Sequence, residues 1–152
     1  MPLFKSVFLA AVISVLLAGT AAASLLRDDS GYVEPDMAVV HQTKGNLLDE
    51  QGRSAEALVE YKEALNFDPD DTNTLFNMGT VYLKMNKPEQ AARIFESLIK
   101  IDSKDTESYN LLGLAYRGCG KKKEAIEVWL KSLAIDPTQT MPKKFIEEAK
   151  AL

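Results

Sequence analysis

The sequence predicts an all-α fold, a solenoid of three similar helix pairs followed by one capping helix. The first observation is that landmark residues recur at a constant interval without insertion or deletion, as from Gly45 to Gly79 and from Gly79 to Gly113. We call this interval the repeat step. The second is the i, i+3, i+4, i+7 spacing of apolar residues in each copy, which is typical of amphipathic helices. The third is the occurrence of turn-forming residues within and after the copies. The other recurring residues are Leu48, Tyr82 and Tyr116; Ala57, Ala91 and Ala125; and Tyr61, Phe95 and Trp129.

Residues 1–23 precede the periodic region, and their sequence is typical of an export signal. Lys5 is the only charged side chain before an apolar stretch from Val7 to Ala18. The small residues Ala21–Ala23 then fit the pattern that signal peptidase cleaves, which would leave Ser24 as the first residue.

The same region is also compatible with an uncleaved membrane anchor. The chain carries no charge from Ser6 to Leu26, a stretch long enough for a membrane-spanning helix. A buried helix of a soluble domain is the least favoured interpretation. Conventional lipid modification is excluded because Thr20 stands where a lipoprotein signal requires cysteine. Either main interpretation places the repeats outside the cytoplasm, in a periplasm or anchored to an inner membrane with Lys5 inside.

Residues 24–35 are expected to form a short polar linker. Arg27–Gly31 has no apolar period and contains glycine, and Pro35 marks the entry to the first helix. The repeat region is expected to span residues 36–137, with copies at about 36–70, 71–104 and 105–138.

Each copy divides into two helical segments. In the second copy, Leu75–Tyr82 predicts one helix and Ala91–Ile99 predicts another after a break at Asn86–Pro88. The third copy repeats this arrangement around a turn at Gly118–Gly120. Aspartates and threonines at the start of the second and third copies are expected to cap the helices that follow.

The recurring glycines predict a close approach between helices. A glycine inside a helix costs about 1 kcal/mol relative to alanine, so its return in every copy implies a steric requirement. We expect two helix backbones to approach there. The recurring alanines would face the glycines, and the recurring aromatic side chains would fill the wider gaps between units.

The order Leu-Gly, Tyr, Ala, aromatic residue and Pro at these offsets resembles the tetratricopeptide repeat over residues 36–137. The third copy is the most similar to the family pattern. The first has His41 and Lys44 where large apolar residues are usual, and the second has Ser103 in place of the closing proline. The resemblance implies a right-handed superhelix whose concave side is formed by the first helix of each pair.

Residues 139–152 are expected to form the capping helix, with Thr140 and Pro142 at its start. Its polar side would face water while its apolar stripe covers the last repeat. Self-association through this end is an alternative. The stripe consists of Phe145, Ile146, Ala149 and Leu152.

The concave face implied by the resemblance is rich in amides, which can pair with the main chain of an extended segment. Three apolar side chains on it would provide pockets. An ordinary solvated face is the alternative interpretation. The candidate partner-binding residues are Gln42, Asn46, Asn73, Phe76, Asn77, Thr80, Lys84, Asn110, Leu111, Leu114 and Arg117; Val39, Asp49 and Glu107 share the face.

One subfamily of the repeat binds peptide C-termini through a carboxylate clamp. Asn46 and Asn77 fall on its two asparagine positions, but Gln42, Glu107 and Leu111 fall on its basic positions. The charges that hold a carboxylate are therefore missing. The resemblance does not imply a chaperone-tail ligand here.

Charge and motif content argue against nucleic-acid, metal and cofactor binding. The net charge is −4, whereas nucleic-acid affinity depends on clustered basic residues. The basic run Lys121–Lys123 lies at a turn and is interpreted as solvated, with a partner or phospholipid contact as the alternative. Cys119 is the only cysteine, in a bend expected to be exposed, so pairing between chains is its alternative to a passive role. No spacing of Cys and His predicts a metal site.

An enzyme is the least favoured function. His41 is the only histidine, and it falls on a helix face expected to pack, which favours a structural role. The sequence contains no glycine-rich phosphate loop, nucleophile elbow or HExxH motif. The sequence therefore predicts a non-enzymatic adaptor of the cell envelope that binds a peptide segment or partner protein. The alternative is a membrane-anchored assembly factor for a pilus, secretion or respiratory complex, using its convex side or its ends.

Overall fold

The computed structural model describes residues 36–151. The predicted export signal at 1–23, the alternative anchor within 6–26 and the linker at 24–35 lie outside the described residues. Within 36–151, no helix combines the length and apolarity that crossing a membrane requires.

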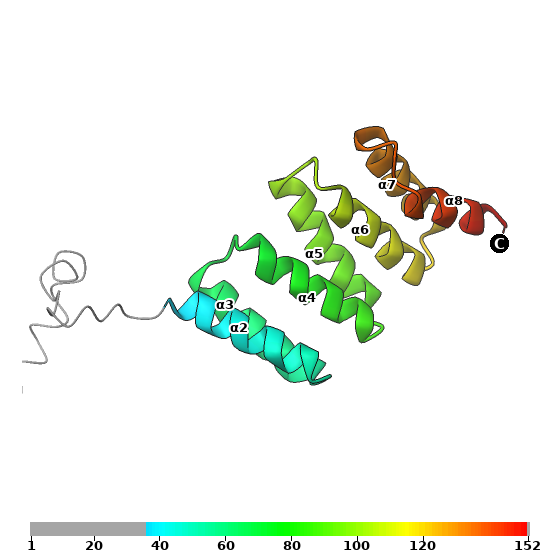
Figure 1. The fold of residues 1–152 in the computed structure, drawn as a ribbon. Coiled ribbons are helices and arrows are strands. Elements are labelled where there is room, and N and C mark those ends of the chain that lie inside the picture. Colours follow the sequence, from blue (N-terminus) through cyan, green and yellow to red (C-terminus); the bar gives the residue numbers. More distant parts are fainter. Residues whose placement is uncertain (1–35, 152) are drawn as a thin grey trace, which may run out of the picture. The chain divides into compact units, whose positions relative to one another are not determined.

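The described chain folds into helices joined by short turns, and it confirms the predicted all-α solenoid (Figure 1). Each of the three pairs packs internally, and each second helix also packs on the first helix that follows it. We call α2, α4, α6 and α8 the first helices and α3, α5 and α7 the second helices. Their bounds are α2 Met37–Glu50, α3 Ser54–Phe67, α4 Thr72–Lys84, α5 Pro88–Ile101, α6 Thr106–Gly118, α7 Lys122–Ile135 and α8 Met141–Ala151.

Aspartate caps begin α2, α4 and α6, and the sequence predicts those of α4 and α6. Asp71 accepts hydrogen bonds from the backbone N–H groups of Asn73 and Thr74, and Asp105 does the same for the equivalent amides of α6. These bonds satisfy amides that the helix itself leaves without partners. The second helices have no side-chain cap, although α5 starts with Pro88.

The turn inside each pair depends on one residue with a positive φ angle. Gly52 and Gly120 have φ values of 75° and 73°, and Asn86 takes the equivalent position with 56°. Glycine and asparagine tolerate this backbone conformation better than other residues. The repeat period therefore fixes the turns as well as the helices.

An aromatic ring lies directly on each recurring glycine. The Tyr61 ring lies on Gly45 and the Phe95 ring on Gly79, where an added Cβ would stand 2.6 Å and 2.8 Å from ring carbons. The Trp129 indole covers Gly113 in the same way. The prediction that these aromatic side chains fill the gaps between units is therefore wrong, because each ring lies on the glycine of its own pair. The aromatic side chain comes from the second helix of the same pair and fills the space over the glycine. It therefore contacts the glycine in place of the backbone of that second helix.

Helix α8 occupies the place of the first helix of a further pair. Pro142, Ile146 and Ala149 stand one repeat step after buried positions of α6, and all three are buried. Ile146 and Ala149 join the cluster around Trp129, with Phe145 partly buried beside them. Glu147 is exposed at the position where the pairs have glycine, so no aromatic ring can lie there as it does on Gly113. This arrangement confirms a capping helix.

Candidate binding surface

The predicted partner-binding residues lie on α2, α4 and α6, and many of them bond to the neighbouring first helix. We call the contact between α2 and α4 the first junction, that between α4 and α6 the second, and that between α6 and the segment through α8 the third. The three junctions differ in chemistry. Their differences decide where a ligand has room.

The first junction is held by side-chain amides. Gln42 Nε2 donates to Asp71 Oδ2 at 2.7 Å and to Thr74 Oγ1 at 2.9 Å. Further along, Asn77 Nδ2 donates to Asn46 Oδ1 at 2.9 Å. These amides therefore already have partners from the chain itself.

Other predicted residues at the first junction are also engaged. Asn46 Oδ1 accepts a second bond from the Tyr61 hydroxyl at 2.9 Å. Lys84 Nζ pairs with Asp49 Oδ2 at 2.6 Å, and Thr80 Oγ1 donates to its own helix at the Asn77 carbonyl. The first junction thus forms a closed polar row.

The third junction repeats this closure with other residues. Asn110 Nδ2 donates to Gln139 Oε1 at 2.6 Å. The Arg117 guanidinium lies over the Trp129 and Phe145 rings, with centroid distances of 5.9 Å and 5.2 Å, and it pairs with a glutamate of α8. Leu111 and Leu114 are half-buried against the two hydrophobic clusters.

The second junction is open. Phe76 stands one repeat step after Gln42 and one before Asn110, and its ring packs edge-on against Phe95 at a centroid distance of 6.1 Å. Phenylalanine offers no hydrogen bond across the junction. A cavity of about 320 Å³ lies here, and we call it the Phe76 cavity. It is lined by Thr72, Asn73, Phe76, Leu98, Asp105 and Glu107.

The Phe76 cavity carries two carboxylates that form no ion pair within residues 36–151. Asp105 accepts bonds from the Glu107 and Ser108 backbone amides and from the Ser108 hydroxyl. Its counterpart Asp71 has an additional donor, the amide of Gln42. Asp105 lacks this partner because Phe76 takes the glutamine position.

Sequence reasoning placed Asn73 and Phe76 among the binding residues but missed Leu98 and Asp105. The signal that could have found the cavity was the break in the series Gln42, Phe76, Asn110, in which one member cannot donate. The binding role of all these residues stays a prediction.

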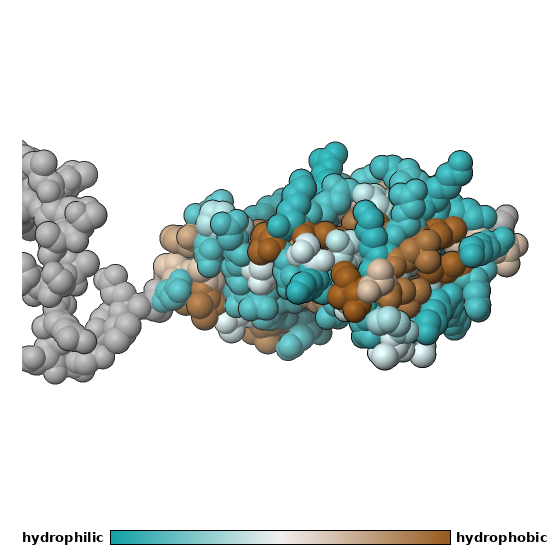
Figure 2. Space-filling view, turned by 90° about the horizontal axis from the view of Figure 1, so that it is seen from above, coloured by the Kyte–Doolittle hydropathy of each residue, from teal (hydrophilic) through white to brown (hydrophobic). Residues whose placement is uncertain are grey.

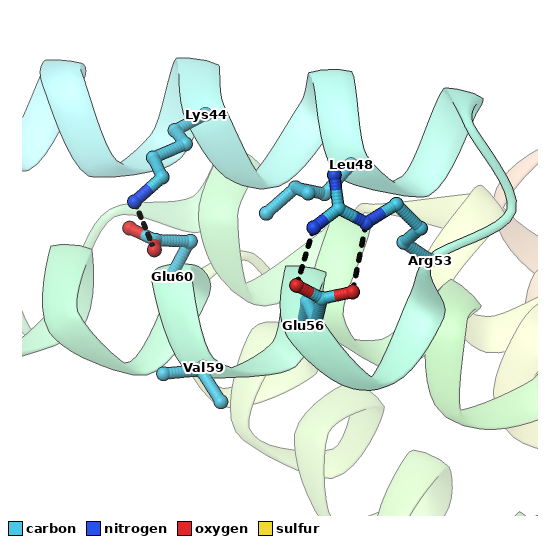
Figure 3. Close-up of a pocket in the computed structure, with 6 residues that line it drawn as sticks. All are labelled: Lys44, Leu48, Arg53, Glu56, Val59 and Glu60. Carbon is cyan, nitrogen blue, oxygen red and sulfur yellow. Dashed lines mark hydrogen bonds and ion pairs between the residues drawn. The ribbon is translucent and has the colours of Figure 1, made fainter.

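A second cavity of similar volume lies between α2 and α3 (Figure 3). Its charges pair with one another: Lys44 Nζ lies 2.6 Å from Glu60 Oε1, and Arg53 donates two bonds to Glu56. The hydrogen bond from Lys44, followed by that from His41, lowers the pKa of the Glu60 carboxyl. This cavity offers a ligand no free charge, so the Phe76 cavity is the stronger candidate.

Comparison with known proteins identifies the helix pairs. Sequence profiles described as "TPR repeat" or "Tetratricopeptide repeat" match residues 45–86, 73–104 and 106–139. The chain carries tetratricopeptide repeats. A heat shock protein sti1 homolog of Schizosaccharomyces pombe is 35% identical over 68 residues. The match covers 45% of this chain but only 12% of that relative.

Solved tetratricopeptide structures have the same fold. The first TPR domain of Spaghetti (RPAP3), bound to the HSP90 peptide SRMEEVD, superimposes with a TM-score of 0.71 at 21% identity, covering 80% of this chain and 97% of that one. MamA from Desulfovibrio magneticus gives a TM-score of 0.72 at 23% identity, covering 75% of this chain and 64% of that one. These likenesses support the tetratricopeptide fold.

His41 of this tetratricopeptide chain has an acidic partner but a packed environment. Its Nδ1 lies 2.8 Å from Glu60 Oε2, and its ring stacks on Phe67 at a centroid distance of 5.8 Å. His41 lines neither of the two cavities described above. Among residues 36–151, no cluster of His, Cys, Asp and Glu could hold a metal ion.

Cys119 is half-buried, and its neighbours Gly118 and Gly120 are exposed, as the sequence predicts for this bend. Burial is the main cause that raises the pKa of this thiol, with Glu89 contributing. A raised pKa lowers the thiolate fraction and with it the reactivity. Beside this turn, Lys121 Nζ lies 5.5 Å from the centroid of the Tyr116 ring.

Proposed function

We propose that this chain is a non-enzymatic adaptor that binds an extended segment of a partner protein on the face of its first helices. The observation that carries the proposal is the Phe76 cavity. It opens at the one junction of this face where the chain's own polar side chains do not close the gap. Its volume of about 320 Å³ suits a single large side chain better than a cofactor, because cofactor and drug-sized sites commonly reach several hundred Å³ more.

The hydrogen bonds at the other two junctions reduce the number of residues that are available to a partner. Gln42, Asn46 and Asn77 already bond within the chain, so a partner would have to displace those bonds to use them. Asn73, in contrast, is exposed at the rim of the cavity, and its side chain can pair with a peptide main chain. The structure of Spaghetti with an HSP90 peptide supports peptide binding as a use of this fold.

We place this adaptor in a cell envelope. The support is the sequence of residues 1–26, with one basic side chain, a long uncharged stretch and small residues before Ser24. Mass analysis of the mature chain would decide between the two forms. A chain that begins at Ser24 indicates export with cleavage, and a chain that retains residues 6–26 indicates an anchor.

A second candidate function uses the second helices. Phe67, Ile101 and Ile135 recur at the repeat step at the ends of α3, α5 and α7, with 57%, 49% and 39% of their surfaces exposed. Figure 2 shows hydrophobic residues gathered in patches on one face, the largest toward the C-terminal helices. Exposed apolar residues that recur regularly suit a flat protein interface. The exposed side chains of Phe67, Ile101 and Ile135 support the alternative of an assembly factor for an envelope complex.

Site-specific cross-linking tests both candidates in the full chain in its native membrane or extract. A photoreactive amino acid replaces Asn73 at the cavity, Ile101 at the apolar edge, or exposed Lys131 of α7 as control. Cross-linked partner peptides are then identified by mass spectrometry. We expect a discrete partner segment from position 73 and none from position 131. A partner captured only from position 101 would replace the adaptor proposal with the assembly function.

A further inference from the structure

We infer that the Phe76 cavity receives a lysine or arginine side chain of the bound segment. This inference rests on the proposed function, since it names the chemistry of the segment that the first helices bind. It adds a specificity for the bound side chain that the fold alone does not supply. Its basis is the difference between the three junctions.

At the first and third junctions, an amide side chain bridges the gap between successive first helices. Gln42 reaches Asp71. Asn110, two repeat steps after Gln42, reaches Gln139, which stands two repeat steps after Asp71. At the second junction, the equivalent pair is Phe76 and Asp105, which cannot bond. Asp71 accepts a hydrogen bond from the Gln42 amide, whereas the carboxylate of Asp105 has no such side-chain donor from α4. A donor from outside the chain can therefore bond to Asp105 at this position.

The charge of the cavity favours a cation. Asp105 and Glu107 bring two full negative charges, and neither forms an ion pair within the described residues. The amino end of α6 opposes them with about half a positive charge. The carboxylates outweigh the helix end, so the cavity is net negative. A guanidinium or ammonium group would form charge-assisted hydrogen bonds with these oxygens.

The apolar lining favours a cation on a long aliphatic stem. Phe76 and Leu98 form part of the wall beside the two carboxylates. Lysine and arginine place methylene groups on apolar surface while the charged end reaches polar groups. The Phe76 ring can also attract the cation through its face. A small inorganic cation would leave the apolar wall uncovered.

The same residues disfavour an acidic segment. Glu107 lies where the carboxylate-clamp resemblance would require a basic residue, and it would repel a carboxylate. Asn46 and Asn77, the two matching clamp positions, bond to each other. We therefore expect this chain to discriminate against acidic peptides such as the SRMEEVD sequence that Spaghetti binds.

Binding of fluorescent peptides to the full chain tests the inference. The probes are short peptides of one alanine–serine sequence that differ only at the central residue, which is lysine, arginine, norleucine, glutamine or glutamate. We expect the lysine and arginine peptides to bind at least about tenfold more tightly than the norleucine and glutamate peptides, as two charge-assisted bonds imply. Equal binding, tighter binding of the glutamate or norleucine peptide, or no binding of any probe would overturn the inference.

Three variants test the residues. Asp105→Asn keeps an oxygen that can cap α6, Glu107→Gln keeps the side-chain shape, and each should reduce the basic preference severalfold. Phe76→Gln should restore the bridge to Asp105 and abolish the preference. Glu127→Gln, on α7 outside the cavity lining, makes the same charge change and should leave it intact. If position 73 still cross-links a partner while the peptides show no basic preference, the adaptor function stands and only the cation assignment fails.

Discussion

The ring of Phe95 lies on the backbone of Gly79, so that an added Cβ would stand 2.8 Å from Phe95 Cζ. The relationship recurs between Tyr61 and Gly45 and between Trp129 and Gly113. It explains why a residue that weakens helices returns in the first helix of every pair. Glycine lowers the stability of the helix, but because it has no side chain the aromatic ring can be fully buried against it. Tyr61, Phe95 and Trp129 are at most 1% exposed.

Gly79→Ala should therefore destabilise the protein. At an open helix position alanine would gain about 1 kcal/mol over glycine, but here its methyl group meets the Phe95 ring. Overpacking of this kind costs about 1–3 kcal/mol, so we expect a net loss measured by urea unfolding. Phe95→Leu in the Gly79→Ala background should cost less than in the unaltered protein. Additive effects in this double-mutant cycle would show that there is no interaction energy between positions 79 and 95.

The repeat period allowed the helix pairs, their caps and the capping helix to be predicted from sequence. It identified which residues share a position in successive pairs. It could not show which residues meet across a junction, because those pairs are separated by 29, 31 or 35 residues. Such offsets depend on how one helix is shifted along the next. The amides of Gln42 and Asn77 were therefore predicted as ligand groups, whereas the structure gives them partners within the chain.

Asn46→Ala should weaken the first junction. Asn46 Oδ1 accepts from both the Tyr61 hydroxyl and Asn77 Nδ2, so its removal leaves a buried hydroxyl and an amide without their acceptor. An unsatisfied buried donor costs about 1–3 kcal/mol, and we expect a loss in this range by urea unfolding. The exposed Asn73→Ala is the control, with an expected change within about 0.5 kcal/mol. Equal effects of the two substitutions would contradict a structural role for Asn46.

Stability should fall at alkaline pH because two tyrosines are held protonated. Burial, with a hydrogen bond to Glu96 adding to it, raises the pKa of Tyr116 to about 12, and burial raises the pKa of Tyr61 to about 12. In the unfolded chain both phenols titrate near about pH 10. Below that pH both states are protonated and the contribution is complete. Between about pH 10 and 12 the unfolded state loses its protons first, so the free energy of unfolding decreases.

Urea unfolding across this alkaline range checks the assignment. Tyr116→Phe should reduce the slope of stability against pH, and adding Tyr61→Phe should reduce it further. The slope is the deciding quantity, because each substitution also removes a hydrogen bond and lowers stability at every pH. A double variant with the slope of the unaltered protein would assign the alkaline loss to other groups.

Arg117→Ala should loosen α8 without disturbing α2. The guanidinium covers Trp129 and Phe145 and links α6 to the last helix, so its loss removes packing as well as charge. We expect faster hydrogen exchange in α8 and unchanged exchange in α2, which lies at the other end of the array. Glu148→Gln should have a much smaller effect, because its ion pair with Arg117 spans 3.4 Å between exposed groups and such pairs contribute about 0–1 kcal/mol. Equal acceleration by both substitutions would show that the ion pair, and not the stacking on the rings, holds α8 in place.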